Sequence, residues 1–520
     1  MADRLNVAEA LLAVSKTSPE STALRIRADA EERDWSYGEL AEAVRRFAGA
    51  LSQLPVVEEQ RVLLALPDSA ELVVAFLGAI WAGAVPVVVN PTLRADDYTF
   101  FLSDTRARLV IGASQSTGAL AKAIDGVPRA RSIELWTVAP GGNGTLWDAV
   151  RGATEAVEPF PALGDDTAFW LYSSGTTGRP KGTIHRHADI LHAVESYGRH
   201  ILAVTARDIV YSTSRMFFAY GLGASLYFPL AAGASSVLSP EPFDAARTWK
   251  LVVDERPTLL FAVPSVYRAM LDQPAPHPDL LSSVRLCLSA GEGLPESLFE
   301  QWQRRFHLEI VDGVGSTEAL HIYLSNRPGA CRPGTLGTPV PGYDVRIVDE
   351  SGRDVARGES GMMLVRGASV AAGYWHRRDA TERAFLGEWF VTGDQAVRDE
   401  DGLYRVLGRV DDMLKVAGQW VSPSDVEETI RSVEGVADCG VVGMSGADGL
   451  TELVACIVAT QEGASGLAAS VEARCAERLP RFKRPRRVVV VGALPRTPTG
   501  KLQRFRLREM MEHARNGEPG

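Results

Sequence analysis

The sequence predicts an α/β fold: a large, multi-layered N-terminal domain of mixed sheets and helices, followed by a small α+β C-terminal domain. Three observations support this prediction. The chain has 520 residues, which is more than one hydrophobic core usually supports. Helical and strand-like patterns alternate over the first four hundred residues. A shorter segment with its own pattern follows Gly408-Arg409-Val410-Asp411-Asp412, so we place the domains at residues 1–409 and 410–520.

Individual elements follow from local patterns. Tyr37–Leu51 is a predicted helix, and Arg61–Leu66 is a predicted strand. In the C-terminal segment, Cys439–Val442 and Leu453–Val458 are predicted strands. This mixture of elements is typical of a layered α/β protein.

One uncharged stretch, Leu72–Val89, approaches the length of a membrane span. Asp68 and Glu71 instead predict a capping box that opens a helix, and Gly83 is its expected C-terminal stop. Val85–Val89 then follows as a buried strand. The sequence therefore predicts a core helix and strand here, and no membrane span.

Composition and charge exclude several classes of protein. The chain is 46% hydrophobic and 23% charged, which is ordinary for a globular protein, and its net charge of −10 argues against nucleic acid as a partner. The N-terminus lacks an apolar signal region, so we expect a cytoplasmic location. An odd number of scattered cysteines favours reduced thiols and no structural zinc; they are Cys287, Cys331, Cys439, Cys456 and Cys475.

A loop rich in glycine, hydroxyl groups and one lysine is the most informative segment. It reads Tyr172-Ser173-Ser174-Gly175-Thr176-Thr177-Gly178-Arg179-Pro180-Lys181-Gly182. Glycines let backbone amides approach phosphate, hydroxyls donate further hydrogen bonds and lysine neutralises charge. It is not a Walker A loop, because the spacing differs and its flanks, Ala168–Tyr172 and Thr183–His187, both resemble strands. A flexible surface loop is the alternative interpretation.

Five further motifs follow in order: Ser289-Ala290-Gly291-Glu292-Gly293, Asp312-Gly313-Val314-Gly315-Ser316-Thr317-Glu318, Thr392-Gly393-Asp394, Gly408-Arg409-Val410-Asp411-Asp412 and Pro498-Thr499-Gly500-Lys501. Together with the loop, they resemble the adenylate-forming superfamily of acyl-CoA synthetases, luciferases and peptide-synthetase adenylation domains. The resemblance covers essentially the whole chain. It implies that a carboxylate attacks the α-phosphorus of ATP and that pyrophosphate leaves, which requires cations and a metal.

The resemblance implies a role for each motif. Lys181 and its loop would hold the β- and γ-phosphates, Thr317 would lie by the α-phosphate, and Glu318 would bind Mg²⁺, a hard cation that prefers oxygen ligands. Asp394 would accept the ribose hydroxyls, and Arg409 would hold the ribose-phosphate region. The implied ATP-binding residues are Ser173, Ser174, Gly175, Thr176, Thr177, Gly178, Ala290, Gly291, Glu292, Asp312, Gly313, Asp394 and Arg409.

Three C-terminal residues complete the implied machinery. Lys501 would bridge the carboxylate and the α-phosphate during adenylate formation, and Asp411 would be the hinge about which a mobile small domain rotates. Gly418 would lie by the pantetheine tunnel, where the absence of a side chain leaves room. These roles imply coenzyme A as the acceptor.

The acid-binding segment reads Arg215-Met216-Phe217-Phe218-Ala219-Tyr220-Gly221-Leu222-Gly223. Alanine stands where amino-acid-activating domains carry an aspartate, so an α-ammonium group would lack a countercharge. The segment, with Gly315–Ile322, resembles the benzoate–CoA ligase branch, although Arg215-Met216 departs from the expected Lys-Leu. The implied acid pocket consists of Phe218, Ala219, Tyr220, Gly315, His321 and Ile322.

The expected function is an ATP-dependent ligase that converts an aromatic acid to its adenylate and then to its coenzyme A thioester. Benzoate, a hydroxybenzoate and an aminobenzoate such as anthranilate all remain open, as does a homodimer. One alternative is a stand-alone aryl-acid adenylating enzyme that loads a carrier protein in trans. A second alternative is an inactive nucleotide-binding homologue.

Overall fold

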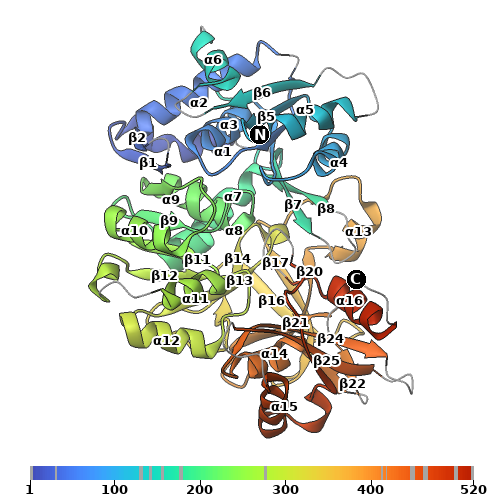
Figure 1. Cartoon of the computed structure of the whole chain (residues 1–520). Helices are drawn as coiled ribbons and strands as arrows, with labels where there is room; N and C mark the ends of the chain where they lie inside the picture. Colours follow the sequence, from blue (N-terminus) through green and yellow to red (C-terminus); the bar gives the residue numbers. More distant parts are fainter. Residues whose placement is uncertain are drawn as a thin grey trace. The chain divides into compact units, whose positions relative to one another are not determined.

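The computed structural model describes residues 4–29, 32–54, 56–127, 133–139, 143–153, 157–174, 180–273, 278–410, 414–416, 419–445, 451–460, 466–496 and 502–516. The chain divides into two compact units (Figure 1). The first unit comprises residues 1–346 and 364–392, and the second comprises residues 347–363 and 393–520. The predicted boundary between residues 409 and 410 stays a prediction.

The first unit contains a nine-stranded sheet whose middle strands are parallel and whose ends are antiparallel. In spatial order its strands are β15 (Thr338–Pro339), β14 (Ile322–Ser325), β13 (Ile310–Gly315), β12 (Leu286–Ser289), β11 (Leu259–Ala262), β9 (Ile209–Ser212), β10 (Ser235–Leu238), β1 (Thr22–Arg27) and β2 (Glu32–Ser36). Parallel neighbours need crossover helices, which is why helices separate these strands along the chain.

The first unit also contains a seven-stranded sheet. Its strands are β18 (Gly373–Tyr374), β8 (Pro180–Arg186), β7 (Thr167–Ser174), β4 (Val85–Val88), β3 (Arg61–Ala65), β5 (Leu109–Ala113) and β6 (Glu134–Val138). Strands β7 and β8 pair antiparallel, with Ser173 opposite Lys181. The prediction that the glycine-rich loop joins strand to strand is therefore confirmed.

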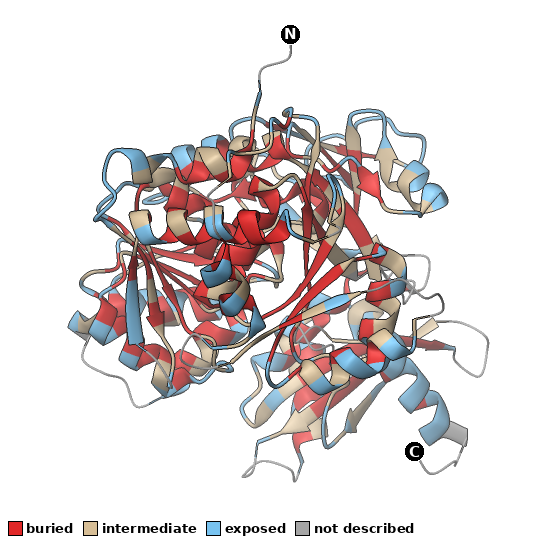
Figure 2. Ribbon diagram, turned by 90° about the horizontal axis from the view of Figure 1, so that it is seen from above, coloured by how far each residue is buried: buried red, intermediate tan, exposed pale blue. Residues whose placement is uncertain are grey.

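Helices cover the two sheets. Side chains of α10, α11 and α12 share one hydrophobic core with β9, β11 and β12, whereas α4 and α5 pack on β3, β4 and β5. Figure 2 shows the burial concentrated in the strands and on the inner sides of the helices. The helices are α1 (Val7–Leu11), α2 (Tyr37–Leu51), α3 (Ala70–Trp81), α4 (Ala95–Thr105), α5 (Thr117–Asp125), α6 (Thr145–Gly152), α7 (His187–Ala193), α8 (Ala219–Leu222), α9 (Phe228–Ala232), α10 (Ala245–Glu255), α11 (Pro264–Asp272), α12 (Glu296–Phe306) and α13 (Arg378–Ala384).

Helix α2 has the bounds that its periodicity predicts, because Ser36 and Glu39 form a capping box at its start. The predicted capping box at the start of α3 is wrong. Ser69 caps this helix, since its side chain accepts from the amide of Leu72. The Asp68 carboxylate is buried and accepts instead from the amide of Met216 at 3.0 Å. The predicted stop of this helix at Gly83 and the buried strand β4 are confirmed.

The second unit has its own core on both faces of a sheet formed by β24 (Val436–Ser445), β25 (Thr451–Ala459) and β26 (Arg487–Val490). Helices α14 (Pro423–Arg431) and α15 (Leu467–Arg478) pack with Val441 on one face, and α16 (Arg504–Asn516) packs with Val442 on the other. Neighbouring residues of a strand point to opposite faces, so one strand serves both cores. The two predicted strands of this segment are confirmed.

Two smaller sheets remain. The first orders β16 (Tyr343–Val348), β17 (Ser360–Gly367), β20 (Trp389–Arg398) and β19 (Phe385–Leu386), with β21 (Tyr404–Arg409) on β20. The second pairs β22 (Leu414–Val416) with β23 (Gln419–Val421). This mixture of parallel and antiparallel sheets with helices, in a large and a small unit, confirms the predicted fold class.

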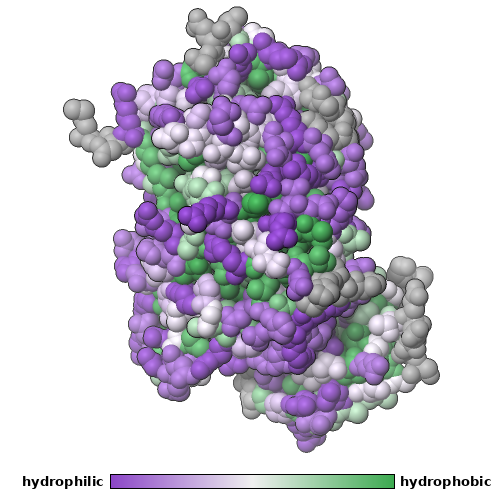
Figure 3. All heavy atoms as spheres, turned by 90° about the vertical axis from the view of Figure 1, so that its left-hand side faces the viewer, coloured by the Kyte–Doolittle hydropathy of each residue, from purple (hydrophilic) through white to green (hydrophobic). Residues whose placement is uncertain are grey.

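The surface agrees with the composition. Hydrophilic side chains dominate the face in Figure 3, and the hydrophobic areas on it are separated from one another. Within the described ranges, no helix is both long and apolar enough to cross a membrane. All five cysteines are free, as their spacing predicts.

Candidate active site

Residues predicted to bind substrate gather at one edge of the nine-stranded sheet. Strands β9, β11, β12 and β13 are consecutive parallel neighbours. The segment with Ala219 and Tyr220 follows β9, Ala290 follows β12, and Gly315 ends β13. Ligands of α/β proteins bind at the carboxyl ends of parallel strands, so the topology brings these separate motifs to one place.

The hairpin of β13 and β14 positions three of the predicted acid-pocket residues. Gly315 pairs with Ile322 across the two strands, and His321 lies next to Ile322 in the chain. A side chain on Gly315 would overlap the carbonyl oxygen of His321. Glycine is therefore required for the two strands to approach this closely.

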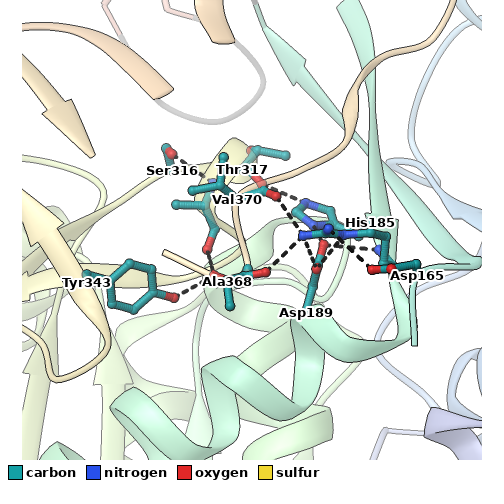
Figure 4. A network of polar contacts seen from close by, with 11 residues as sticks. Asp165, His185, Asp189, Ser316, Thr317, Tyr343, Ala368 and Val370 are labelled. Atoms are coloured by element: carbon teal, nitrogen blue, oxygen red, sulfur yellow. Dashed lines mark hydrogen bonds and ion pairs between the residues drawn. The ribbon is translucent and has the colours of Figure 1, made fainter. Parts of the chain in front are cut away.

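Between those strands, Thr317–Ala319 forms one 3₁₀ turn, whose start is capped by the hydroxyl of Ser316. All three carbonyls of the turn accept a hydrogen bond from outside it. Nε2 of His185 lies 2.8 Å from the Thr317 oxygen, the Ala371 amide donates to Glu318 at 2.8 Å, and the Ser369 hydroxyl donates to Ala319 at 2.8 Å. Figure 4 shows the turn within this polar network. The backbone carrying Thr317 and Glu318 is thus fixed at every residue.

Tyr374 joins two of the predicted catalytic residues and was not predicted itself. Its hydroxyl donates to Oε1 of Glu318 at 2.8 Å, and Nζ of Lys181 lies 4.4 Å from the centre of its ring. The short strand β18 places Tyr374 opposite Thr183 of β8, beside Lys181. A cation over an aromatic face is attracted by the ring quadrupole. No local periodicity distinguishes this tyrosine, because its role depends on partners far away in the chain.

A ring of aromatic side chains surrounds His321. The ring centres of Tyr197, Tyr220, Tyr227 and Phe228 lie 5.2, 5.5, 6.2 and 4.7 Å from that of the imidazole. Burial lowers the pKa of His321 to about 3, so the imidazole is neutral near pH 7. The predicted pocket residue Tyr220 thus lies against His321.

A π-helical segment shapes this region. Residues Gly223–Tyr227 extend α8 with wider turns and direct Tyr227 toward the imidazole. A Cβ atom on Gly223 would lie 2.5 Å from Cδ2 of His321 and 2.6 Å from the hydroxyl of Tyr227. Single π-helical turns are frequent at functional sites. Only a residue without a side chain fits between these two groups.

Several buried polar atoms in and around the predicted acid pocket have no hydrogen-bond partner among the described residues. They include Nδ1 of His321 and the hydroxyls of Tyr220 and Tyr227. Nε2 of His321 faces the carbonyl oxygen of Tyr220 at 3.4 Å. Buried polar groups are normally satisfied, and exceptions call for an explanation such as a ligand or water. The region therefore combines aromatic walls with polar groups that can bind a ligand.

The residues predicted to hold adenine lie on adjacent strands. Ser289 at the end of β12 is opposite Asp312 of β13, which brings Ala290–Glu292 next to Asp312 and Gly313. Gly291 has a positive φ of 87°, which favours glycine. The carboxylate of Glu292 accepts from the amide of Ser265 at 3.3 Å. Burial raises the pKa of Asp312 to about 7.

Within the second unit, Asp394 and Arg409 are paired residues of β20 and β21. The guanidinium of Arg409 lies 3.2 Å from Oδ1 of Asp394. Their predicted roles toward ribose and phosphate stay predictions.

Seven predicted residues lie outside the described ranges: Gly175, Thr176, Thr177, Gly178, Asp411, Gly418 and Lys501. Ser173 and Ser174 close strand β7, directly before that gap. In the part of the chain that is described, no group of three or more His, Cys, Asp and Glu side chains could hold a metal ion by itself. Glu318, the predicted metal ligand, is a single carboxylate with Oε1 occupied by Tyr374.

Comparisons with known proteins agree with the fold. The AMP-binding enzyme family matches residues 12–375, and the AMP-binding enzyme C-terminal domain matches residues 425–501. The chain therefore belongs to the AMP-binding enzyme family. It is 41% identical to a 4-hydroxybenzoate–CoA/benzoate–CoA ligase of Rhodopseudomonas palustris, over 92% of this chain and 89% of that protein.

Two solved structures are similar over nearly the whole chain. A benzoate CoA ligase from Burkholderia xenovorans LB400 is 39% identical with a TM-score of 0.88, covering 96% of this chain and 99% of its own. An anthranilate CoA ligase in complex with anthranoyl-AMP is 34% identical with a TM-score of 0.92, covering 99% of both. The chain is thus an AMP-forming acid–thiol ligase of the benzoate–CoA ligase type, as the motifs predicted.

Proposed function

We propose that this ligase activates a benzoate whose ring carries a hydroxyl or amino group, or benzoate itself, and transfers it to coenzyme A. In the first step a carboxylate oxygen attacks the α-phosphorus of ATP, and the bond to pyrophosphate breaks. In the second step the thiol of coenzyme A attacks the acyl carbon, and AMP leaves with the oxygen that joined it to the acid.

The observation that carries this proposal is the proximity of the aromatic pocket to the 3₁₀ turn. His321 follows Glu318 by three residues. The ring of a bound acid would therefore lie by the aromatic side chains around His321, and its carboxylate would lie by the turn. Aromatic side chains around His321 suit a flat ring. Ala219 supplies no charge for an α-ammonium group, which favours a simple aryl acid.

Residues of the first unit are proposed to handle the triphosphate. Lys181 would neutralise the β- and γ-phosphates, and Thr317 would donate to the α-phosphate. Glu318 fits a magnesium ion as one carboxylate ligand beside phosphate oxygens, since Tyr374 occupies Oε1 and orients the group. When bound, such an ion would neutralise the charge that develops on the leaving pyrophosphate.

Residues of the second unit and the undescribed positions keep their predicted roles as proposals. Asp394 would accept the ribose hydroxyls, and Arg409 would contact the ribose-phosphate region. Lys501 would bridge the acid and the α-phosphate, Asp411 would be the hinge, and Gly418 would leave room for pantetheine. We also propose a cytoplasmic location, which five free cysteines support.

ATP–pyrophosphate exchange over a panel of acids tests the proposal. The panel contains benzoate, the three hydroxybenzoates and 2-aminobenzoate, with cyclohexanecarboxylate and phenylalanine as controls for flatness and for the α-amine. We expect exchange with at least one aromatic acid, and at most about one tenth of that rate with either control. Equal rates with cyclohexanecarboxylate would contradict a flat aromatic pocket.

The acceptor is tested with the best acid of that panel. Free coenzyme A should yield the aryl thioester at a rate close to that of exchange. A phosphopantetheinylated carrier protein, offered at the same concentration, should react far more slowly. A preference for the carrier by orders of magnitude would instead identify a carrier-loading enzyme, and no exchange with any acid would identify an inactive homologue.

A further inference from the structure

We propose that the buried pair His185–Asp189 is a positioning device for adenylate formation. It fixes the turn that carries Thr317 and Glu318 to the strand that carries Lys181. The inference rests on the proposed function, because that function gives these three residues their roles. Neither His185 nor Asp189 belongs to the predicted site.

The two side chains form a continuous link to the turn. Nδ1 of His185 lies 3.1 Å from Oδ2 of Asp189, and both side chains are 0% exposed. Nε2 of the same imidazole lies 2.8 Å from the carbonyl oxygen of Thr317. In Figure 4 the imidazole lies between Asp189 and Thr317. Phe169 stacks on the ring at 5.1 Å between ring centres, which holds its plane.

The hydrogen bond from His185 to the turn has a fixed direction. A carbonyl oxygen only accepts, so Nε2 of His185 carries a proton and donates it to Thr317. Nδ1 of the same ring faces the Asp189 carboxyl group at 3.1 Å. The ring is hydrogen-bonded at both nitrogens, which prevents it from flipping.

Asp189 is itself held in place. Its carboxylate accepts from the amide and from Nε of Arg186, both at 3.0 Å. The same guanidinium donates to the carbonyls of Ala368 and Val370 at 2.9 and 3.1 Å. Those two residues flank Ser369, which donates to the turn at Ala319. One cluster around Asp189 therefore supports the turn by two separate routes.

Strand β8 connects the His185–Asp189 pair to Lys181. Lys181 and His185 are four residues apart in β8, so they lie on the same face of the strand at a fixed separation. A turn bonded to His185 is held at a set distance from Lys181 by a β-strand, which is more rigid than a loop. An apolar pair of the same volume would fill the space equally well. The polar pair adds a specific hydrogen bond to Thr317.

Two conservative substitutions separate this role from simple packing. In His185→Gln the amide nitrogen replaces Nε2 and can still donate to Thr317, whereas in His185→Asn it replaces Nδ1 and reaches only Asp189. Both are measured in the full chain by ATP–pyrophosphate exchange, by the reaction of a supplied aryl-adenylate with coenzyme A, and by thermal unfolding.

We expect His185→Asn to lower kcat for exchange by about a hundredfold, the effect of a misplaced reacting group. His185→Gln should stay within about threefold of the wild type, as expected for a retained donor. The KM for the acid and the rate with supplied adenylate should change little in both. Equal loss in both variants, or no loss in either, overturns the inference. A wild type inactive with every acid overturns the proposed function and this inference with it.

Arg186→Ala provides a second test that does not disturb the buried ring, since its side chain is 28% exposed. We expect exchange to fall by about tenfold, with the supplied-adenylate reaction retained, because Asp189 and the Ala368–Val370 segment lose their common donor. Arg199→Ala, which removes an exposed ion pair with Glu195 in the π-helical segment Val194–Leu202 after α7, is the control and should not change either rate. Unchanged exchange in Arg186→Ala would also overturn the inference.

Discussion

The turn Thr317–Ala319 and the predicted acid pocket around His321 are neighbours in the chain but differ in how their polar groups are satisfied. Each carbonyl of the turn accepts a hydrogen bond from another segment. In the pocket, by contrast, Nδ1 of His321 and the hydroxyl of Tyr220 have no partner among the described residues. The turn is fixed by hydrogen bonds, and the pocket is shaped by aromatic packing.

The difference matches two separate tasks. Groups that stabilise a developing charge must be oriented before the reaction, so that no energy is spent on reordering them. Groups that recognise a substituent must instead be free to bind it, which leaves them unpaired inside the protein. Glu318 of the turn and His321 are three residues apart, so that the hairpin of β13 and β14 serves both chemistry and recognition.

The strongest test of the chemical side concerns Lys501. We expect Lys501→Ala to lower adenylate formation by about a hundred- to a thousandfold, because a cation at the transferring phosphate is lost. A supplied aryl-adenylate should still react with coenzyme A. Lys250→Ala, which removes an exposed ion pair with Asp254, is the matched control and should be silent. Equal loss of both half-reactions in Lys501→Ala would contradict the assigned role.

Glu318 and Tyr374 test whether orientation matters beyond charge. Glu318→Gln keeps an oxygen for the Tyr374 hydroxyl but loses the charge, and we expect exchange to fall by about a hundredfold with a higher requirement for Mg²⁺. Tyr374→Phe keeps the ring beside Lys181 and loses only the hydrogen bond, so about a tenfold loss is expected. A larger loss of exchange rate in Tyr374→Phe than in Glu318→Gln would contradict the view that the charge of Glu318 contributes more than its orientation.

The recognition side is tested by His321→Ala and Gly223→Ala. We expect His321→Ala to reorder the preference among ortho-substituted benzoates by about tenfold, with little change in the KM for ATP.

Gly223→Ala should raise the KM of every aromatic acid, since the added methyl group would press on His321 and Tyr227. Kinetics over the acid panel measure both effects. An unchanged preference order in His321→Ala would remove this residue from recognition.

The smallest expected effect concerns stability at Asp312. Burial raises its pKa to about 7, so between about pH 4 and pH 7 the folded chain binds a proton that the unfolded chain has released. The stability that this carboxyl group contributes is therefore lost as pH rises toward 7. Asp312→Asn does not titrate, and we expect its unfolding free energy to gain roughly 1–3 kcal/mol on the wild type between pH 5 and pH 8. Chemical denaturation at the two pH values measures this gain, and a constant difference would contradict it.

Local elements were predictable because their signals are local. The periodicity and capping of Tyr37–Leu51 predict the helix with its observed bounds, and the strand patterns around the glycine-rich loop predict the hairpin of β7 and β8. The cap of α3 was misplaced by one residue. Asp68 fits the local pattern of a cap, but its carboxylate bonds to Met216, 148 residues further along the chain. A short-range pattern cannot reveal such a competing partner.

By itself, the sequence determined the order of the elements, the family and the set of candidate residues, since these depend on composition, periodicity and ordered motifs. Only the tertiary structure decided which side chains support them. Tyr374 contacts Glu318 across 56 residues, and His185 contacts Thr317 across 132. Neither histidine nor tyrosine stands in a pattern that predicts these partners. Strand β8 supplies the contact of His185, and its neighbour β18 supplies the contact of Tyr374. Packing between such distant segments leaves no periodic signal in a single chain.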